Sequence, residues 1–346
     1  MKSVAMFNNK GGVGKTTLLC NLAACLSLAM NKRVLVVDCD PQCNTTQLIM
    51  GEEFAASFYW DENHKDKPTT IADVLRPIHD GDSDISDSFA PIGKSKNRFG
   101  VDLIAGHPTL SFLEDKLSEA WTNVTAGDIG GYRRTNWARN LCEKYANAYD
   151  IVLFDVGPSL GALNRSVLLG CDNFVTPMGT DIFSILGIRN ISQWLGEAIR
   201  AYEHGIVRCE ERSPGGFEKY GIPTRPSIAN GFAGYTLNQY QTKSKGGERV
   251  ATERYEEIIR KVPTEIEGLR GRYGRNGLSS TEAKLGDVPH LYSLIPLAQT
   301  RAAPIMTLAA KDGIVGSQYK MVENYREIVL NIGANFLRNI AEEAAA

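Results

Sequence analysis

The stretch that decides the fold is SVAMFNNKGGVGKTTLL, residues 3–19. Its apolar start, Val4 to Phe7, predicts a buried parallel strand, and Thr16 to Leu19 predict the first turns of a helix. The loop between them has glycine at positions 11, 12 and 14, where the backbone adopts conformations closed to bulkier residues. The N–H groups of such a loop, with the positive end of the following helix, surround a polyphosphate. This order therefore predicts a phosphate-binding loop.

Two side chains of the loop have a defined task in nucleotide binding. Lys15 supplies positive charge to the β- and γ-phosphates, and the Thr16 hydroxyl is placed to ligate Mg²⁺. The general pattern G-x-x-x-x-G-K-[ST] has glycine where this chain has Asn9, and a second lysine, Lys10, precedes the glycines. The simplest interpretation of Lys10 is a solvated side chain in a flexible loop.

The segment KGGVGKTT, residues 10–17, resembles the deviant Walker A motif of the ParA/MinD family of P-loop ATPases. The resemblance implies that Lys10 is the signature lysine, which reaches across a dimer interface to the nucleotide of the other subunit. It also implies that the loop binds ATP. From this segment we expect the contacting residues to be Asn9, Lys10, Gly11, Gly12, Val13, Gly14, Lys15, Thr16 and Thr17.

Two acidic strand ends complete the predicted site. Residues 33–38 predict a second buried strand, and the DCDPQ segment at its end resembles the switch I segment of the family. The resemblance implies that Asp40 orients the attacking water and that Asp38 supports the metal shell. Residues 149–155 have the Walker B arrangement, in which Asp155 holds Mg²⁺. We therefore expect Thr16, Asp38 and Asp155 at the metal, and Lys10, Lys15 and Asp40 as catalytic residues.

The segments that follow carry looser resemblances to the same family. The GPSLG segment, residues 157–161, resembles its PPSLG switch II, with Gly157 in place of the first proline. Asp181, ahead of a predicted helix over 182–194, lies near an acidic residue that faces the dimer partner in the family. Asn238 follows a predicted strand over 228–237, where the family has a polar residue against adenine. A predicted strand over 290–295 ends at Pro296 and resembles the adenine-flanking loop.

Residues 243–275 hold nine Lys or Arg and six Glu. Up to Lys261 the pattern predicts a charged helix face, and residues 269–275 predict an exposed basic loop. One interpretation is a solvated helix and loop. The other is contact with DNA phosphates irrespective of sequence, through Arg270, Arg272 and Arg275. The resemblance favours the second interpretation, because the family uses basic residues of its C-terminal part in this way.

Composition limits the remaining possibilities. The 346 residues predict one domain, 1–346, with insertions at about 51–100 and 203–226. Its fold class is α/β, a doubly wound, mostly parallel sheet with helices on both faces. A net charge of −2 gives no global signal for nucleic acid, so any DNA contact must be a local patch. Seven cysteines without a CxxC pair predict free thiols rather than a metal cluster.

The first residues run directly into the predicted strand, so we expect neither a signal peptide nor a preceding helix-turn-helix domain. No apolar run reaches the ~18 residues of a membrane span. Apolar spacing over 319–341 predicts a last helix, and its scarcity of lysine and acidic end indicate packing against the body. The sequence therefore predicts no membrane partner.

These features predict a Mg²⁺-dependent ATPase of the cytoplasm and nucleoid that forms a homodimer around two ATP molecules. The resemblance implies slow hydrolysis, stimulation by a ParB-like partner, and non-specific DNA binding that segregates or positions a plasmid or chromosome region. The same switch could serve another cargo, conjugation or phage defence. A MinD-like ATPase would need a basic amphipathic terminus, and a metabolic ligase or synthase would not need Lys10.

Overall fold

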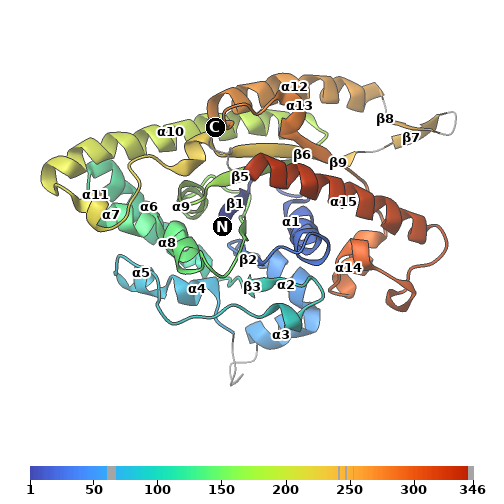
Figure 1. The fold of residues 1–346 in the computed structure, drawn as a ribbon, viewed down its shortest axis with the longest axis horizontal. Helices are drawn as coiled ribbons and strands as arrows, with labels where there is room; N and C mark the ends of the chain where they lie inside the picture. The colour runs from blue at the N-terminus through green and yellow to red at the C-terminus, as the bar shows by residue number, and fades with distance from the viewer. Residues whose placement is uncertain (61–67, 241, 246–247, 252, 342–346) are drawn as a thin grey trace.

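The computed structural model describes residues 1–60, 68–240, 242–245, 248–251 and 253–341, with the backbone alone between 239 and 259. Within these residues a seven-stranded sheet has the order β3-β2-β4-β1-β5-β6-β9, and all its strand pairs are parallel (Figure 1). This confirms the predicted doubly wound α/β fold. The strands of this sheet are β1 (Lys2–Met6), β2 (Val34–Asp38), β3 (Asp102–Ile104), β4 (Ile151–Asp155), β5 (Asn173–Gly179), β6 (Phe232–Tyr240) and β9 (Lys284–Pro289).

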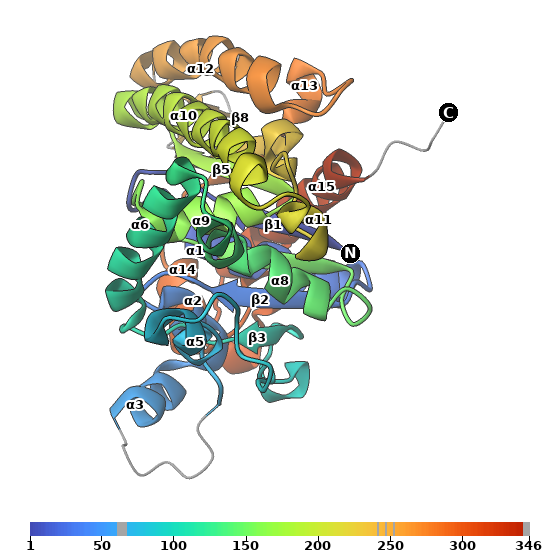
Figure 2. The same ribbon diagram turned by 90° about the vertical axis from the view of Figure 1, so that its left-hand side faces the viewer.

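Helices cover both faces of the sheet. Side chains alternate along a strand, so Ala5 and Phe7 enter one core and Val4 and Met6 the other. The layer over the first core faces the viewer in Figure 2 and includes α6 (Leu110–Ala126), α8 (Trp137–Lys144), α9 (Ala162–Gly170) and α10 (Ile182–Arg212). The layer over the second core includes α1 (Lys15–Ala24) and α15 (Gln318–Ile340).

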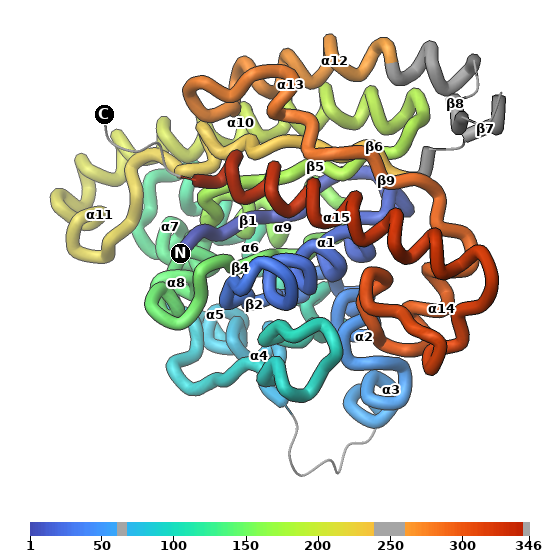
Figure 3. Tube along the Cα trace, turned by 45° about the vertical axis from the view of Figure 1, so that its right-hand side comes forward, coloured from blue at the N-terminus to red at the C-terminus, as the bar shows by residue number. Residues whose placement is uncertain are grey.

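Shorter helices fill the edges of the molecule. A third core joins α14 to α15 through residues such as Leu294 and Tyr325, and Figure 3 shows α14 beside the first turns of α15. The other helices are α2 (Asn44–Met50), α3 (Glu52–Trp60), α4 (Ile71–Val74), α5 (Arg76–Asp80), α7 (Ile129–Thr135), α11 (Gly216–Lys219), α12 (Glu253–Tyr273), α13 (Ser280–Ala283) and α14 (Leu294–Thr300).

The strand register brings the two acidic strand ends to the glycine loop. Met6, the last residue of β1, pairs with Asp155 of β4, and Asp38 of β2 pairs with Asp155 from the other side. In a parallel sheet the carboxyl ends of the strands share one edge, where ligands bind. The sheet therefore places the phosphate-binding loop and both carboxylates at the same edge.

Several predicted elements are wrong between 203 and 300. Residues 203–212 belong to α10 and are not part of an excursion. Residues 242–245 and 248–251 form an antiparallel pair, β7 (Thr242–Lys245) and β8 (Glu248–Ala251), so the charged helix begins only at Glu253. The last strand of the sheet is β9, and the segment predicted as a strand over 290–295 instead leads into α14. Leu291 and Leu294 are buried with helical spacing, which explains the error.

The predicted basic loop over 269–275 is also wrong, because α12 continues to Tyr273. Leu269 and Tyr273 are buried at i, i+4 spacing and anchor this end of the helix. A polar cap, by contrast, fixes the start of α4. The Thr70 and Asp73 side chains form a reciprocal capping box at the start of α4.

The C-terminal helix packs on the body of the protein, as predicted. Its buried residues recur at helical spacing and include Val322, Tyr325, Val329 and Phe336. Among the residues that the structure describes, no helix is long and apolar enough to cross a bilayer. All seven cysteines are buried free thiols, which confirms that prediction.

The crossing of α10 over α6 generates a stability prediction. Gly205 of α10 lies so close to α6 that a Cβ there would overlap the carbonyl oxygen of Val124 and the Tyr132 hydroxyl. We expect Gly205→Ala to lower the free energy of unfolding by about 1–3 kcal/mol through overpacking.

Gly268 of α12 is the matched control, because a Cβ there meets nothing within 4 Å. We expect Gly268→Ala to raise the free energy of unfolding by about 0.5–1 kcal/mol, the gain in helix propensity. Urea unfolding followed by circular dichroism measures both variants. Equal stability of Gly205→Ala and the unmodified protein would contradict the tight crossing.

Candidate functional site

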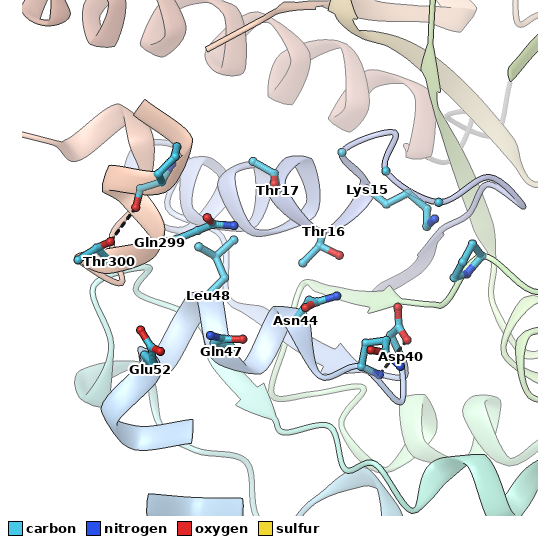
Figure 4. A pocket seen from close by; sticks show the side chains of 16 residues that line it. Lys15, Thr16, Thr17, Asp40, Asn44, Gln47, Leu48, Glu52, Gln299 and Thr300 are labelled. Carbon is cyan, nitrogen blue, oxygen red and sulfur yellow. Dashed lines mark hydrogen bonds between the residues drawn. The ribbon is translucent and has the colours of Figure 1, made fainter. Parts of the chain in front are cut away.

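The glycine loop opens a pocket of about 600 Å³ at the carboxyl edge of the sheet (Figure 4). Gly12 and Gly14 have φ of 73° and 80°, the left-handed region that glycine adopts without strain. This backbone turn lets α1 begin at Lys15 directly behind the loop. The pocket is lined by Gly11, Gly12, Gly14, Lys15, Thr16, Thr17, Asp40, Gln42, Asn44, Gln47, Leu48, Glu52, Pro158, Pro296, Gln299 and Thr300.

Lys15 is a buried ammonium at this pocket, with 7% of the residue exposed. Its Nζ donates to the carbonyl oxygen of Lys10 at 3.1 Å. Burial lowers the pKa of Lys15, and the negative charges of Asp155 and Asp40 oppose that shift. A desolvated cation next to converging backbone N–H groups is suited to bind phosphate oxygens.

Asp155 connects the start of α1 to the start of α2 through hydrogen bonds. Its Oδ2 accepts hydrogen bonds from the hydroxyls of Thr16, at 2.8 Å, and Thr45, at 2.7 Å. Its Oδ1 is buried and has no hydrogen-bond partner in the described part of the chain. Burial raises the pKa of Asp155 to about 6, against the lowering effect of the two hydroxyls. A carboxylate oxygen left without a donor beside a threonine hydroxyl fits a magnesium ion with its water ligands.

Asp38, which the sequence predicts at the metal, lies behind the pocket and is not among its lining residues. It is fully buried, and its Oδ2 accepts from the backbone N–H and the hydroxyl of Thr46, at 2.8 and 2.6 Å. Its Oδ1 accepts from the N–H of Asp40 at 3.3 Å. Burial, followed by the charge of Asp155, raises the pKa of Asp38 to about 7. Asp38 therefore holds the 38–46 segment in place behind the pocket.

Asp40 itself lines the pocket, as predicted. Its Oδ1 accepts from the N–H of Gln42 at 3.0 Å, which fixes the carboxylate on the turn after β2. A Cβ on Gly157 would lie 3.3 Å from the same oxygen, so the 157–161 loop passes directly beside Asp40. Figure 4 shows Lys15 and Asp40 at the same end of the pocket, while Gln299 and Glu52 lie toward the other end.

Asn238, which the sequence predicts at the adenine, stands outside the pocket lining in this structure. It is 3% exposed, its Nδ2 donates to the carbonyl oxygen of Val13 at 2.9 Å, and its Oδ1 accepts from the Thr236 hydroxyl. Asn238 thus supports the phosphate-binding loop from β6. Pro296 does line the pocket, from the first turn of α14. Val13 and Asn9 lie outside the lining.

Lys10 also lies outside the pocket lining and pairs within its own chain. Its Nζ is 2.5 Å from Oδ2 of Asp181. Oδ1 of Asp181 accepts from the N–H groups of Phe183 and Ser184 and thereby caps α10. Although partial burial acts to raise it, hydrogen bonds from Lys10 and Ser184 hold the pKa of Asp181 below its ordinary value. Asp181 therefore has an in-chain partner in Lys10.

The three arginines predicted to contact DNA do not share one exposed loop. Arg270 pairs with Glu267 and donates to the carbonyl oxygen of Leu278 at 2.5 Å. Arg272 is exposed, with one long contact of 3.4 Å to the Ser192 hydroxyl. Arg275 is half-buried and lines a second, polar cavity at the opposite edge of the sheet.

The sequence did not predict the far wall of the pocket or the Thr45 hydroxyl, one of the two hydrogen-bond donors to Asp155. The far wall comes from α2, α3 and α14. Of these, α3 lies in the predicted insertion 51–100, and α14 begins within the segment predicted as a strand over 290–295. Thr45 had a usable signal, because it lies in a polar run directly after the DCDPQ segment. Among the described residues, no group of three or more His, Cys, Asp or Glu side chains is arranged to hold a metal ion.

A comparison with protein-family models matches residues 1–206 to a family described as an AAA domain. The chain belongs to this family. Its strand, glycine loop, Walker B aspartate and DCDPQ segment all lie inside the matched residues. The match confirms the resemblance to ParA-type P-loop ATPases that the sequence motifs predicted.

Curated relatives include ParA and Soj proteins. The chain is 30% identical over 195 residues to the virulence plasmid ParA family protein pGP5-D of Chlamydia muridarum, covering 56% of this chain and 62% of that protein. It is 30% identical over 193 residues to the sporulation initiation inhibitor protein Soj of Bacillus subtilis, covering 55% and 63%. The chain thus spans less than two thirds of the length of each of these relatives.

Solved structures share the fold over more of the chain. Protein DIP2308 from Corynebacterium diphtheriae is 32% identical, with a TM-score of 0.72 and coverage of 98% of both chains. Cobyrinic acid a,c-diamide synthase from Mycobacterium smegmatis with bound ADP and magnesium is 20% identical, with a TM-score of 0.52 and coverage of 76% and 82%. The second likeness shows the fold alone.

Asp181 both caps α10 and pairs with Lys10, and this generates a prediction about stability. Asp181→Ala removes both the cap of α10 and the partner of Lys10, and we expect it to lower the free energy of unfolding by about 1–2 kcal/mol. Asp181→Asn keeps a capping oxygen and loses only the ion pair. Because both partners are more than a third exposed, we expect a loss of at most about 0.5 kcal/mol for Asp181→Asn.

Urea unfolding of both variants at moderate salt measures the difference. The interpretation would be wrong if Asp181→Asn lost as much stability as Asp181→Ala, because the ion pair rather than the cap would then dominate.

Proposed function

We propose that this protein binds ATP with Mg²⁺ and hydrolyses it as a nucleotide-dependent switch. One observation carries the proposal: a glycine loop in the left-handed conformation, a buried Lys15 and the Thr16–Asp155 pair converge on a single pocket. Backbone N–H groups and Lys15 bind the phosphates. Thr16 and Asp155 would hold Mg²⁺, which would supply positive charge to neutralise the β- and γ-phosphates.

Asp40 orients the attacking water in this proposal. It lines the phosphate end of the pocket next to Pro158, and its carboxylate is fixed by the Gln42 N–H. Hydrolysis then depends on positioning rather than on covalent chemistry by the protein, as in other phosphoryl transfers.

Dimerisation completes the site by bringing in Lys10 from a second subunit. The Lys10–Asp181 pair is partly exposed, and such pairs contribute at most about 1 kcal/mol. An incoming nucleotide phosphate is a stronger partner for the lysine than one exposed carboxylate. Breaking the Lys10–Asp181 pair so that Lys10 can reach the neighbouring subunit's ATP therefore costs little free energy. The lysine then offsets negative charge in the transition state.

The cargo in this proposal is a plasmid or chromosome region, held through non-specific DNA contact in the nucleoid. The relatedness to ParA and Soj proteins supports this, and a ParB-like partner would stimulate the slow basal hydrolysis. Figures 1 and 2 show α12 as the outermost helix beyond α10. Arg272 and Lys261 are exposed on it.

A second candidate is the same ATP switch serving a different cargo. A difference of cargo would be expected in the predicted insertions, at about 51–100 and 203–226. A MinD-like membrane task has less support, because α15 is packed on the body and its described part shows no free basic face.

Two substitutions separate binding from hydrolysis. We expect Lys15→Ala to abolish ATP binding, because it removes a buried cation that lines the phosphate end of the pocket. We expect Asp40→Ala to retain ATP within about threefold in affinity and to lower the hydrolysis rate by about 100-fold or more. A fluorescent ATP analogue measures binding, and phosphate release measures turnover.

Gln193→Ala is a suitable control, since this exposed side chain on α10 bonds only to Glu197 in the described structure. Turnover of Asp40→Ala at the unmodified rate would remove Asp40 from its assigned role.

The exposure and ion pairing of the arginines generate a prediction about which of them contributes more to DNA binding. We expect Arg272→Glu to weaken binding to non-specific duplex DNA by about tenfold, because an exposed cation is replaced by an anion beside phosphates. We expect Arg270→Glu to weaken DNA binding less than Arg272→Glu does, since Arg270 already pairs with Glu267. Binding is measured with ATP, ADP and no nucleotide, at 50 and about 200 mM salt.

Salt-sensitive binding that requires ATP is the expected pattern. Retention of Arg272→Glu on DNA at full affinity, with ATP affinity unchanged, would exclude this end of α12 as the contact.

A further inference from the structure

The loop after β4, residues 157–161, is tied down by the helix that follows it. Asn164, in the first turn of α9, is 2% exposed. Its Nδ2 donates to the carbonyl oxygens of Gly157, at 2.8 Å, and Ser159, at 2.7 Å. Pro158 lies between these two carbonyls and lines the nucleotide pocket. The position of α9 therefore determines the position of one pocket wall.

A carboxylate from another helix holds the start of α9. Glu114 of α6 accepts hydrogen bonds from the N–H groups of Ala162 and Leu163, the latter at 3.0 Å. The N-cap residue of α9 is Gly161, which offers no side chain for this purpose. The first N–H groups of a helix need an acceptor, and a negative charge at this end is stabilised by the helix dipole. Glu114 supplies both.

Gly161 is explained by the same carboxylate. Its φ of −79° is open to any residue, so the backbone does not demand glycine here. A Cβ at this position, however, would overlap Oε1 of Glu114. Glycine at 161 is therefore the residue that lets Glu114 reach the N–H groups of α9.

The next turn of α9 is held by aromatic rings. The Arg165 guanidinium lies 4.6 Å from the ring centre of Trp121 on α6 and 5.8 Å from that of Trp194 on α10. Trp194 in turn contacts Phe7, with ring centres 5.6 Å apart, at the point where β1 enters the phosphate-binding loop. Burial lowers the pKa of Arg165, and the negative charge of Glu114 opposes this shift. The start of α9 is thus connected to both the 157–161 loop and the 8–14 loop.

We propose that Glu114 is a positioning residue for ATP hydrolysis, which acts through α9 to set where the 157–161 loop stands relative to Asp40. The inference rests on the proposed function, because the position of this loop affects turnover only if the pocket hydrolyses ATP. Glu114 is not among the described residues that line the pocket. It acts by fixing the helix end to which Asn164 and the loop are attached.

The test compares Glu114→Ala with the unmodified protein. We expect kcat to fall by about tenfold, the effect of losing roughly one charged hydrogen bond at the loop, with the dissociation constant for ATP changed less than about twofold. Glu114→Gln retains an acceptor oxygen and should recover part of the rate. Glu119→Ala, an exposed glutamate on the same helix, is the control and should behave as the unmodified protein.

A double-mutant cycle distinguishes positioning from general destabilisation. Gly161→Ala should slow the unmodified protein, because the new methyl group displaces the Glu114 carboxylate. In the Glu114→Ala background the same change should have no further effect. Additive effects, or an unchanged kcat in Glu114→Ala, would overturn the proposal.

Amide hydrogen exchange gives a readout that does not need turnover. We expect faster exchange over residues 157–163 in Glu114→Ala and no change in Glu119→Ala. If the unmodified protein does not hydrolyse ATP, the proposed function fails, and exchange then decides the structural part alone. Unchanged exchange in Glu114→Ala would show that Glu114 does not position the loop.

Discussion

The carboxylate of Asp155 is the constraint on which the rest of the site depends. One of its oxygens accepts from Thr16, on the helix that follows β1, and from Thr45, on the helix that follows β2. Two hydroxyl donors on one oxygen hold two helix starts against the end of β4, in a place where the pKa of the carboxyl is already raised by burial. A buried anion is costly unless donors surround it, so the hydroxyls of Thr16 and Thr45 stabilise the carboxylate where it is buried. The other oxygen, Oδ1, accepts no hydrogen bond in the described protein, and a buried carboxylate oxygen of this kind is suited to bind a cation.

The sequence was sufficient for the phosphate end of the site because the determinants there are local. A strand, three glycines, Lys15 and Thr16 lie within a single short stretch, and the left-handed conformations of Gly12 and Gly14 are encoded by the residues themselves. The doubly wound, parallel class of the sheet followed from buried strands separated by helices. The carboxyl edge of such a sheet then necessarily gathers Asp38, Asp40 and Asp155.

Other parts could not be predicted because they depend on distant partners. Asn238 is a polar residue near a strand end, which is typical of a ligand contact. Only the packing of β6 against the 8–14 loop shows that its side-chain amide donates to the carbonyl oxygen of Val13. The 269–275 segment has the composition of a loop, and it is helical to Tyr273 because Leu269 and Tyr273 bury against α10. Glu114 carries no local signal at all, since its partners lie 48 and 49 residues away.

The length of α10 has a mechanical consequence. Its 31 residues form one continuous helix about 46 Å long. One end is capped by Asp181 beside Lys10, and the other reaches α11 at the far side of the molecule (Figure 1). A rigid rod converts a small rotation at one end into a large displacement at the other, about 8 Å for 10° over this length. The surface around α11 is therefore the part of the described molecule that most amplifies any movement at the nucleotide edge of α10.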